Sequence, residues 1–482
     1  MSHSLQRLKL SLGAAFLVAV SFYVLTMREE VTLSKYVPLP PIPFMSKPWP
    51  RPKAAFNPEA HTFPNADAFL PHFRAVTEMP GLSMEEAKAG CDWPNLADVN
   101  FMYGDDAEWV VTDRNDTELE MRRNQWHEFI NNELMPYQNF QHRFEGRGIA
   151  IVAGNEKTVK RVKVIIRALK KLQSQLPIEF HYWNDELTPA AKEDLIAMWP
   201  HKIYFNDLSS PTNIAKTDYN AFMINYQFKT AAVMNSRFAE VLLLDSDNIP
   251  VLDPATLFES ETYKTYGTLF WPDIARTRPN NPAWAITNTA CRMDEYEQES
   301  GQMIVDKRRF FYHLQLAAWL NNEHGIYYNR FLLGDKDMFR FTWHALKTKF
   351  GFPPRWLTSV GTLNDGHYCG HTFAQHHPNG DVAFMHGGLL KGFPKPFTKW
   401  QRESNGGVFQ VYKRSRHDKQ LGEVVNVSIK FDDGHYFPDR KPDMSAFSCT
   451  GLYDEEAKPL DEILPGFEQM FEEIGGYWML DE

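Results

Sequence analysis

The sequence predicts an α/β protein with a mostly parallel central sheet. The first observation is the uncharged run Val241 to Leu244, which is typical of a strand buried on both faces and is followed directly by Asp245, Ser246 and Asp247. The second observation is a regular alternation of strand-like and helix-like patterns from Gly148 onward. Such alternation gives parallel strands joined by right-handed crossovers, so the loops that follow the strands should meet along one edge of the sheet.

The alternating elements can be placed by their hydrophobic periodicity and helix signals. In residues 155–175, the spacing of Val162, Ile165 and Leu169 predicts an amphipathic helix. Thr188 and Pro189 are typical of a helix start. The full prediction is strands at 148–154, 178–183, 202–205, 241–244, 266–273, 301–307 and 381–388, and helices at 155–175, 188–199, 221–237, 308–323 and 334–347.

Length and charge limit the classes of protein that fit. The chain has 482 residues, which suits two or three domains or one enlarged catalytic domain with appendages. Its net charge of -10 argues against a nucleic-acid-binding protein, which needs a basic face. No Cys-x-x-Cys pair is present, so a structural zinc site is not expected. Two disulfides in any of three pairings, or four free thiols, are open for Cys91, Cys291, Cys369 and Cys449.

The N-terminal region predicts a membrane-anchored protein. Residues 10–27 carry no charge and are long enough to cross a membrane as a helix, although a cleaved signal peptide is the alternative. The predicted order is a cytoplasmic tail (1–9), the anchor, an extended proline-rich stem (28–80), a largely helical lead-in (81–145) and a catalytic domain (146–482). Asn115 and Asn426 begin N-glycosylation acceptor motifs, which agrees with a luminal catalytic domain.

Asp245 and Asp247 are the strongest candidates for metal ligands. Two carboxylates at the carboxyl end of a buried strand suit a hard divalent cation that also binds substrate phosphates. A plain surface turn is the alternative, because Asp, Asn and Pro favour turns. Asp335 and Asp337 form a second Asp-x-Asp, but they sit at a predicted helix start, where acidic residues compensate the helix dipole.

A second set of candidates follows the other predicted strands. The strand at 381–388 delivers His386 to a loop, where it could be a third metal ligand or a structural histidine. Gly387 and Lys391 come directly after it and are candidates for contact with a diphosphate. The long polar segment 274–300 could carry substrate contacts or be a simple excursion. Candidate substrate contacts on the strands that border it are Trp271, Asp273 and Gln302.

Five segments in order give the chain a resemblance to a known family. EVLLLDSDNIPVLDPATLF, GTLFWPDIARTRPNNPAW, EYEQESGQMIVDKRR, GDKDMF and FMHGGLLK resemble the fungal Golgi α-mannosyltransferases that build mannan side chains. The resemblance implies a type II Golgi membrane protein with a GT-A-like nucleotide-sugar-binding domain. It also implies GDP-mannose as donor, manganese as cofactor, and transfer with retention of the α configuration.

The resemblance also suggests roles for individual residues. Asp245, Asp247 and His386 would hold manganese, and Lys391 would add positive charge at the diphosphate. Asp335 stands in a Gly-Asp-x element similar to that of the retaining glycogenin-type transferases, which implies a catalytic carboxylate near the sugar. Helix capping by Asp335 is the alternative.

The functional hypothesis is therefore transfer of mannose to a mannose-containing glycan. The WPD segment is more similar to the α-1,2 branching members, and an α-1,3 linkage is the alternative. A membrane-tethered, non-catalytic glycan-binding homologue is a further alternative. A metal-dependent hydrolase is disfavoured because the sequence shows no clustered His and Asp set for two metals. Partners implied by the resemblance are GDP-mannose, a glycan acceptor and other Golgi transferases.

Overall fold

The computed structural model describes residues 61–92, 114–221, 224–332, 334–364, 366–387, 395–414, 429–432, 449–452 and 455–480. These described residues belong to one compact unit. The predicted anchor at 10–27 lies outside them, as does the first part of the predicted stem. Within the described ranges, no helix combines the length and the apolar character that crossing a membrane requires.

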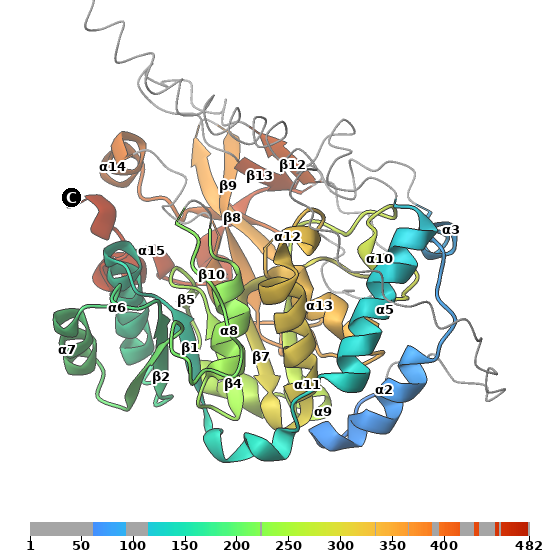
Figure 1. The fold of residues 1–482 in the computed structure, drawn as a ribbon. Helices are drawn as coiled ribbons and strands as arrows, with labels where there is room; N and C mark the ends of the chain where they lie inside the picture. Colours follow the sequence, from blue (N-terminus) through green and yellow to red (C-terminus); the bar gives the residue numbers. More distant parts are fainter. Residues whose placement is uncertain are drawn as a thin grey trace, which may run out of the picture. The chain divides into compact units, whose positions relative to one another are not determined.

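The central sheet has the predicted mostly parallel architecture (Figure 1). Parallel pairing joins β3 to β2, β2 to β1, and β1 to β4, whereas β7 is antiparallel to both of its neighbours. The strands, in spatial order, are β3 (Ile203–Asp207), β2 (Ile178–Tyr182), β1 (Arg147–Val152), β4 (Glu240–Leu244), β7 (Gln298–Asp306) and β6 (Thr268–Pro272).

Strand β4 is buried on both faces, as its uncharged sequence predicts. Leu242 and Leu244 belong to one hydrophobic core, which also contains the apolar side of α6 (Glu156–Lys171). Val241 and Leu243 belong to a second core, shared with α8 (Gln227–Asn235) and α11 (Lys307–Ala318). Successive strand residues point to opposite faces, so the sheet separates two layers of helices.

Two helices begin where capping signals in the sequence place them, whereas α8 begins at Gln227 instead of the predicted 221. The Asn155 side chain accepts a hydrogen bond from the Thr158 backbone N–H at the start of α6. Thr188 caps α7 (Pro189–Met198) in the same way. The other helices are α2 (Leu70–Thr77), α3 (Met84–Lys88), α5 (Asp116–Asn132), α9 (Glu261–Tyr266), α10 (Ala283–Ile286), α12 (Gly325–Tyr328), α13 (Lys336–Ala345), α14 (Lys395–Ser404) and α15 (Phe467–Glu473).

A second six-stranded sheet packs against the α6 side of the central sheet, and the sequence predicted only one of its strands. Its apolar residues join the core that contains α6. Neighbouring strands in the pairs β8–β9, β9–β10, β10–β5, β8–β11 and β11–β14 run antiparallel. The spatial order is β14 (Lys458–Pro459), β11 (Val411–Lys413), β8 (Thr358–Asn364), β9 (His367–His376), β10 (Val382–His386) and β5 (Ile249–Pro250). A separate pair is β12 (Ile429–Asp432) and β13 (Cys449–Leu452).

The end of the predicted stem is helical instead of extended. Residues Ala66–Phe69 form a 3-10 turn that continues into α2. Phe69 and Phe73 are buried against α11, where their rings contact Phe310 and His313. Pro71 does not prevent this helix because it lies in the first turn, where a backbone N–H is not needed. Together with α5, this segment belongs to the hydrophobic core that also contains α8 and α11.

The polar segment 274–297, which lies within the predicted loop 274–300, is largely buried. Trp284 is 1% exposed, and its indole N–H donates to the Arg278 carbonyl. Ion pairs to α13 neutralise its charges, with Glu297 2.8 Å from Lys336 and Glu295 2.6 Å from Arg340. Ion pairing offsets the cost of burying these charges. Hydropathy alone does not reveal which charges are paired.

The four cysteines form two disulfide bridges, and so they are not free thiols. Cys91 pairs with Cys291, which ties the N-terminal helical segment to the buried segment before β7. Cys369 in β9 pairs with Cys449 in β13, which ties the second sheet to the short strand pair. Two disulfides agree with an oxidising compartment.

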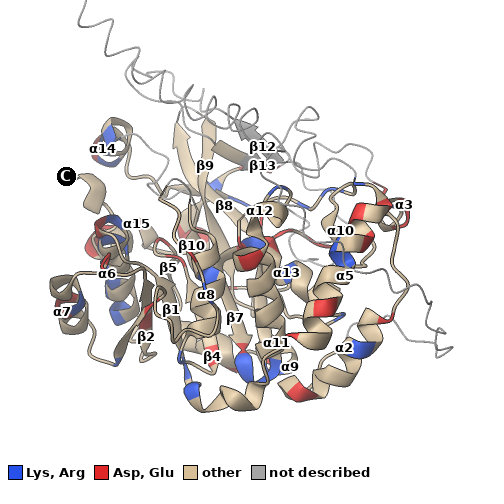
Figure 2. Ribbon diagram, in the orientation of Figure 1, with Lys and Arg blue, Asp and Glu red and all other residues tan. Residues whose placement is uncertain are grey.

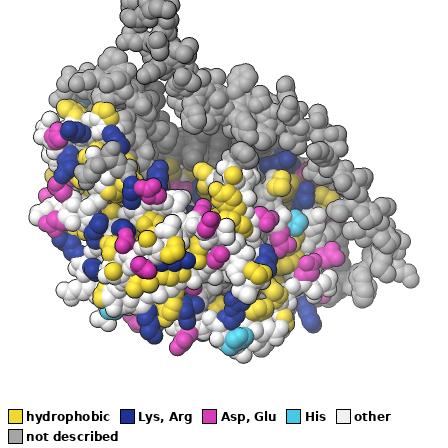
Figure 3. All heavy atoms as spheres, turned by 60° about the vertical axis from the view of Figure 1, so that its left-hand side comes forward, with side chains coloured by type: hydrophobic (Ala, Val, Ile, Leu, Met, Phe, Trp, Pro, Cys, Tyr) yellow, Lys and Arg dark blue, Asp and Glu magenta, His cyan; other side chains and the backbone are white. Residues whose placement is uncertain are grey.

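Charged residues of both signs are spread over the described surface. Figure 2 shows Lys, Arg, Asp and Glu together on α5 and α6. On the face drawn in Figure 3, basic and acidic side chains alternate instead of forming one continuous basic patch. This distribution agrees with the argument from net charge against nucleic-acid binding.

The helical N-terminal segment predicts a specific loss of stability. Phe73 is 1% exposed, so Phe73→Ala should lower the free energy of unfolding by about 3–5 kcal/mol through loss of buried area and an unfilled cavity. Leu70→Ala is the matched control, because Leu70 lies in the same helix but is 37% exposed. Thermal and denaturant unfolding measure both changes. Equal, small effects would mean that residues 66–77 do not pack on the catalytic unit.

Candidate functional site

The Asp245-Ser246-Asp247 turn lies where the order of the parallel strands reverses. The chain places β2 and β3 on one side of β1 and then places β4 on the other side. A crevice forms at such a point because the loops after β1 and β4 lead away in opposite directions, and open α/β sheets bind ligands there. The structure therefore puts Asp245 and Asp247 at the position that the sequence predicted.

His386 comes to the same place through the second sheet. Strand β5 follows the aspartates almost directly and pairs with the end of β10, with Met385 opposite Ile249. The His386 Nε2 atom lies 3.5 Å from Asp245 Oδ2 and 3.7 Å from Asp247 Oδ1. One ligand atom from each of the three residues lies within 4.8 Å of the others. Two carboxylates and an imidazole at these distances can bind one divalent cation.

Two residues of β7 fix the orientation of the His386 ring. Gly301 in β7 has no Cβ, and a Cβ there would lie 2.2 Å from His386 Cε1. Glu299, also in β7, has an oxygen 3.5 Å from His386 Nδ1. The ring thus presents Nδ1 to Glu299 and Nε2 to the aspartates, which is the usual carboxylate–histidine arrangement behind a metal. Among the described residues, Nε2 has no hydrogen-bond partner at normal distance, as expected for a ligand atom facing a cation site.

The electrostatics of the cluster favour positive charge at its centre. Burial alone would lower the pKa of His386, but Glu299 and Asp245 outweigh it and raise that pKa to about 10. Burial alone would raise the pKa of Asp245, but Lys229 and His386 hold it well below its usual value. His386 is therefore a doubly protonated, positively charged imidazolium at neutral pH, unless a metal ion replaces the proton on Nε2.

Lys229 is a site residue that sequence reasoning missed. Its ammonium, on α8, lies 2.8 Å from Asp245 Oδ1 and 3.5 Å from Asp335 Oδ2. It also donates a hydrogen bond to the Ser300 carbonyl at 3.3 Å. The available signal was that Lys229 is the single charged residue of α8, whose sequence is QFKTAAVMN. A lone lysine in such a helix needs a buried partner of opposite charge.

Asp335 lies next to the cluster, on the other side of Lys229. It occupies the position before α13, yet its side chain makes no capping hydrogen bond, so helix capping does not account for it. It is 2% exposed. Burial and the nearby Asp245 raise the pKa of Asp335, and Lys229 opposes this shift. Lys229 thus contacts both Asp245, which belongs to the candidate metal cluster, and Asp335, which does not.

Arg161 is a second cation that the sequence did not single out. It lies on α6, and its Nη1 atom is 3.5 Å from Asp247 Oδ2. Helical periodicity places Arg161 off the apolar side of the helix, but it does not show which of the polar positions faces the end of a strand. The cluster therefore has a cation on each side, Lys229 from α8 and Arg161 from α6.

The second Asp-x-Asp does not form a metal pair. Asp337 is ion-paired with Arg340 at 2.8 Å. The intervening Lys336 lies 2.5 Å from Asp273 and 2.8 Å from Glu297. These contacts bind the start of α13 to the buried segment 274–297, and so they fix the position of Asp335.

The remaining predicted residues have different surroundings. Trp271, in β6, is buried and donates its indole N–H to the His376 carbonyl at 2.7 Å. Gln302, in β7, accepts a hydrogen bond from Asn248. Together with Asp273, they are engaged by other protein groups, and their predicted substrate contacts gain no support. Gly387 follows β10 with φ of 101°, a conformation that favours glycine. Lys391 and Asn426 lie outside the described residues.

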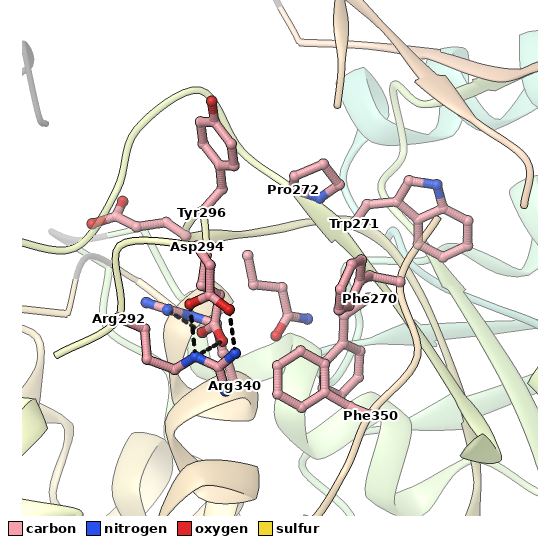
Figure 4. Close-up of a pocket in the computed structure, with 12 residues that line it drawn as sticks. Phe270, Trp271, Pro272, Arg292, Asp294, Tyr296, Arg340 and Phe350 are labelled. Carbon is pink, nitrogen blue, oxygen red and sulfur yellow. Dashed lines mark hydrogen bonds and ion pairs between the residues drawn. The ribbon is translucent and has the colours of Figure 1, made fainter. Parts of the chain in front are cut away.

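A pocket of about 420 Å³ lies beside the segment 292–298, away from the metal cluster. Figure 4 shows Arg292, Asp294 and Arg340 together on one side and Phe270 and Phe350 on the other. Arg292 pairs with Asp294 at 2.5 Å, and Arg340 pairs with Glu295 at 2.6 Å. Because these charges neutralise each other, the pocket offers no net positive charge to a diphosphate.

Comparison with known proteins indicates a family of glycosyltransferases. A family model described as "Mannosyltransferase putative" matches residues 146–297 and 282–377, which include Asp245, Asp247 and Asp335. The chain matches this mannosyltransferase family over residues 146–377. A relative in Candida albicans, alpha-1,2-mannosyltransferase MNN2, is 22% identical over 409 residues, which are 72% of this chain and 65% of the relative. Another from the same organism, alpha-1,2-mannosyltransferase MNN24, is 26% identical over 281 residues, which are 48% of this chain and 37% of the relative.

The chain thus spans between 37% and 65% of the length of these two relatives. Among solved structures, core-mannan synthase A from Aspergillus fumigatus, in its Mn/GDP form, matches 43% of this chain and 67% of its own. The identity is 10% and the TM-score is 0.23, a likeness too weak to establish a shared fold.

The cluster predicts a measurable cation affinity. Asp247→Asn should weaken Mn²⁺ binding by about 10-fold or more, because one charged ligand becomes neutral, while thermal unfolding should change little. Asp253→Asn is the matched control, since Asp253 caps the 3-10 turn Pro254–Glu259 and asparagine caps equally well. Isothermal titration with Mn²⁺ measures both. Equal affinity in Asp247→Asn and the wild type would remove Asp247 from the cation site.

Proposed function

We propose that this chain is a retaining, metal-dependent mannosyltransferase that moves mannose from GDP-mannose to a mannose-containing glycan. The observation that carries the proposal is the cluster of Asp245, Asp247 and His386 at the reversal of strand order, in a chain that matches the mannosyltransferase family. A GT-A-like nucleotide-sugar-binding unit is part of the proposal. It is supported by the parallel strands β3, β2, β1 and β4 with an acidic pair directly after β4.

The proposed cofactor is manganese, and the residues present fit such an ion. Asp245, Asp247 and His386 would hold it, and it would supply positive charge to stabilise the GDP leaving group. Arg161 adds a further positive charge 3.5 Å from Asp247, on the α6 side of the cluster. In the proposed complex, the diphosphate lies over the cluster and the nucleoside extends into the crevice between the ends of β1 and β4.

Lys229 and Asp335 are proposed to act on the sugar side of the diphosphate. Lys229 contacts Asp245 and Asp335 at once, so it sets the distance between the metal cluster and the second carboxylate. Retention requires either a nucleophile on the face opposite GDP or a short-lived oxocarbenium-like species, and a carboxylate near the anomeric carbon stabilises both. Asp335 is buried, lies beside the cluster and does not cap a helix, so it suits this role.

An α-1,2 linkage is the proposed product. Three relatives with α-1,2 names cover 72%, 51% and 48% of this chain, whereas a relative with a probable α-1,3 name covers 47%. The same site chemistry serves an α-1,3 linkage if the acceptor binds in another orientation. A non-catalytic glycan-binding homologue is the competing function. Its surface would not need a buried lysine that joins the metal cluster to a separate carboxylate, and this chain has one.

Transfer itself is the direct test. Full-length protein with GDP-mannose, Mn²⁺ and mannobiose should release GDP and form a trisaccharide, and chelation should abolish both. Asp335→Asn should reduce kcat by about 100-fold or more while Mn²⁺-dependent GDP binding and thermal stability stay unchanged, because the lost group acts on the sugar. Linkage analysis of the trisaccharide separates an α-1,2 from an α-1,3 product.

Two results would contradict this assignment. A wild-type protein that binds mannobiose but never releases GDP would be a glycan-binding homologue. An Asp335→Asn variant with normal kcat would leave the buried carboxylate with a purely structural role.

The proposed location is the Golgi membrane, with the catalytic unit in the lumen. Asn115 is exposed and caps α5 through its side chain, so removing the acceptor motif at Asn115 would also damage the helix. Thr117→Ala removes the motif and keeps the cap. In a eukaryotic host, glycosidase should increase the mobility of the wild-type chain more than that of Thr117→Ala. No shift in either, together with protease sensitivity from the cytosol, would reverse the topology.

A further inference from the structure

An aromatic side chain stands exposed beside the candidate catalytic carboxylate. Tyr226, immediately before α8, is 41% exposed. Its ring lies against Gly334, where a Cβ would be 3.1 Å from the Cγ and Cδ1 atoms of the ring. Gly334 has φ of +72° and directly precedes Asp335. The ring therefore covers the backbone that leads into Asp335 and keeps much of its surface open to solvent.

The loop before Tyr226 is built to hold this position. The Asn225 side chain accepts a hydrogen bond from the Asn220 N–H at 2.8 Å and donates one to the Asn220 carbonyl at 3.1 Å. Gln227 donates to the Asp218 carbonyl at 2.8 Å. The residues on both sides of Tyr226 are thus fixed to the base of the loop, so exposure of the ring is not a result of a loose chain end. An exposed, fixed aromatic ring beside a reaction centre is characteristic of a binding surface.

The phenol belongs to the electrostatic environment of the site. Burial and the neighbouring Asp335 raise the pKa of Tyr226, and Lys229 opposes the shift. The hydroxyl therefore stays protonated at neutral pH and is able to donate a hydrogen bond. A pyranose ring has a C–H face that is apolar and hydroxyls at its rim, so an aromatic face with a polar tip matches it well.

We propose that Tyr226 is the stacking platform for the terminal hexose of the acceptor glycan. This inference rests on the proposed function and extends it to the second substrate. The acceptor sugar would lie on the exposed face of the Tyr226 ring, with one hydroxyl directed toward Asp335 and the donor sugar. The platform selects for a sugar with an apolar face, and it requires no charge on the acceptor.

The position of Tyr226 favours the acceptor over the donor nucleotide. Tyr226 precedes α8, which packs in the core on one face of the central sheet, whereas α6 packs in the core on the other face. The crevice between β1 and β4, with Arg161 of α6, is where the donor nucleotide is proposed to bind. Tyr226 lies against Gly334, next to Asp335, and Lys229 links Asp335 to Asp245 of the cluster. In the proposed complex, a sugar on Tyr226 would therefore approach Asp335 from the α8 side, and the nucleotide would lie toward α6.

Kinetics with the full-length protein test the platform. Tyr226→Ala should raise the KM for mannobiose by about tenfold or more, because stacking area is lost. Mn²⁺-dependent GDP binding, measured by isothermal titration, should be unchanged. Tyr226→Phe keeps the ring and should stay within about twofold of the wild-type KM. Tyr219→Ala is the matched control, since Tyr219 is a 46% exposed tyrosine of the same loop that stacks on Trp183 instead.

Each outcome decides the proposal. An unchanged mannobiose KM in Tyr226→Ala, or an equal rise in Tyr219→Ala, would overturn it. A loss of GDP affinity in Tyr226→Ala, together with the rise in KM, would assign the ring to the donor site and would also overturn the proposal. Saturation-transfer NMR with mannobiose separates this inference from the proposed function. Binding that depends on Tyr226 in a protein without transferase activity would reject the function and keep the platform.

Discussion

The candidate site depends on the short pairing between β5 and β10. Strand β4 alone delivers Asp245 and Asp247, but a third ligand comes only because the chain after them pairs with the end of β10. The pairing of Met385 with Ile249 leaves His386 in register with the acidic turn. Because a slip of one residue would send the next side chain to the opposite face, this register decides whether the imidazole faces the aspartates. The second sheet is thus part of the site and not an appendage.

Charge balance in the site depends on the same arrangement. Asp245, Asp247, Glu299 and Asp335 are four carboxylates in a small, buried volume, and they face Lys229, Arg161 and His386. Buried charges are stable only when they are matched. With a divalent cation in place and His386 neutral, the four negative charges would be balanced by the cation, Lys229 and Arg161. The arrangement is therefore suited to hold a divalent cation next to a carboxylate that does not bind it.

A separate ionic network fixes the position of Asp335, the proposed catalytic carboxylate. Lys336 bridges Asp273 and Glu297, and Arg340 bridges Asp337 and Glu295. These pairs bind α13 to the buried segment before β7 and so fix the backbone at Asp335. The ion pairs have little net stabilising value once the cost of desolvation is counted, but they specify one position for the helix. Positional precision of this kind matters most next to a reacting atom.

The sequence by itself determined the central sheet, its parallel order and the acidic turn after β4. These features follow from local rules: an uncharged run from Val241 to Leu244 must be buried on both faces, and helix signals such as Asn155 and Thr188 act on their own neighbours. The resemblance of short segments supplied the family, which the family model confirmed. Asp245, Asp247 and His386 were therefore within reach of sequence reasoning.

Only the tertiary structure decided which distant residues meet. Lys229 and Arg161 look like ordinary helix charges until α8 and α6 are packed on opposite faces of β4. By sequence, Phe73 belongs to a proline-rich stem, and only the packing of α2 against α11 shows that it is a core residue. The pairing of the four cysteines has no local signal in the sequence. Each of these facts depends on contacts between segments far apart in the chain. Local periodicity reports the environment of a residue but not its partner, and the partner is what makes a lysine or an aspartate part of a site.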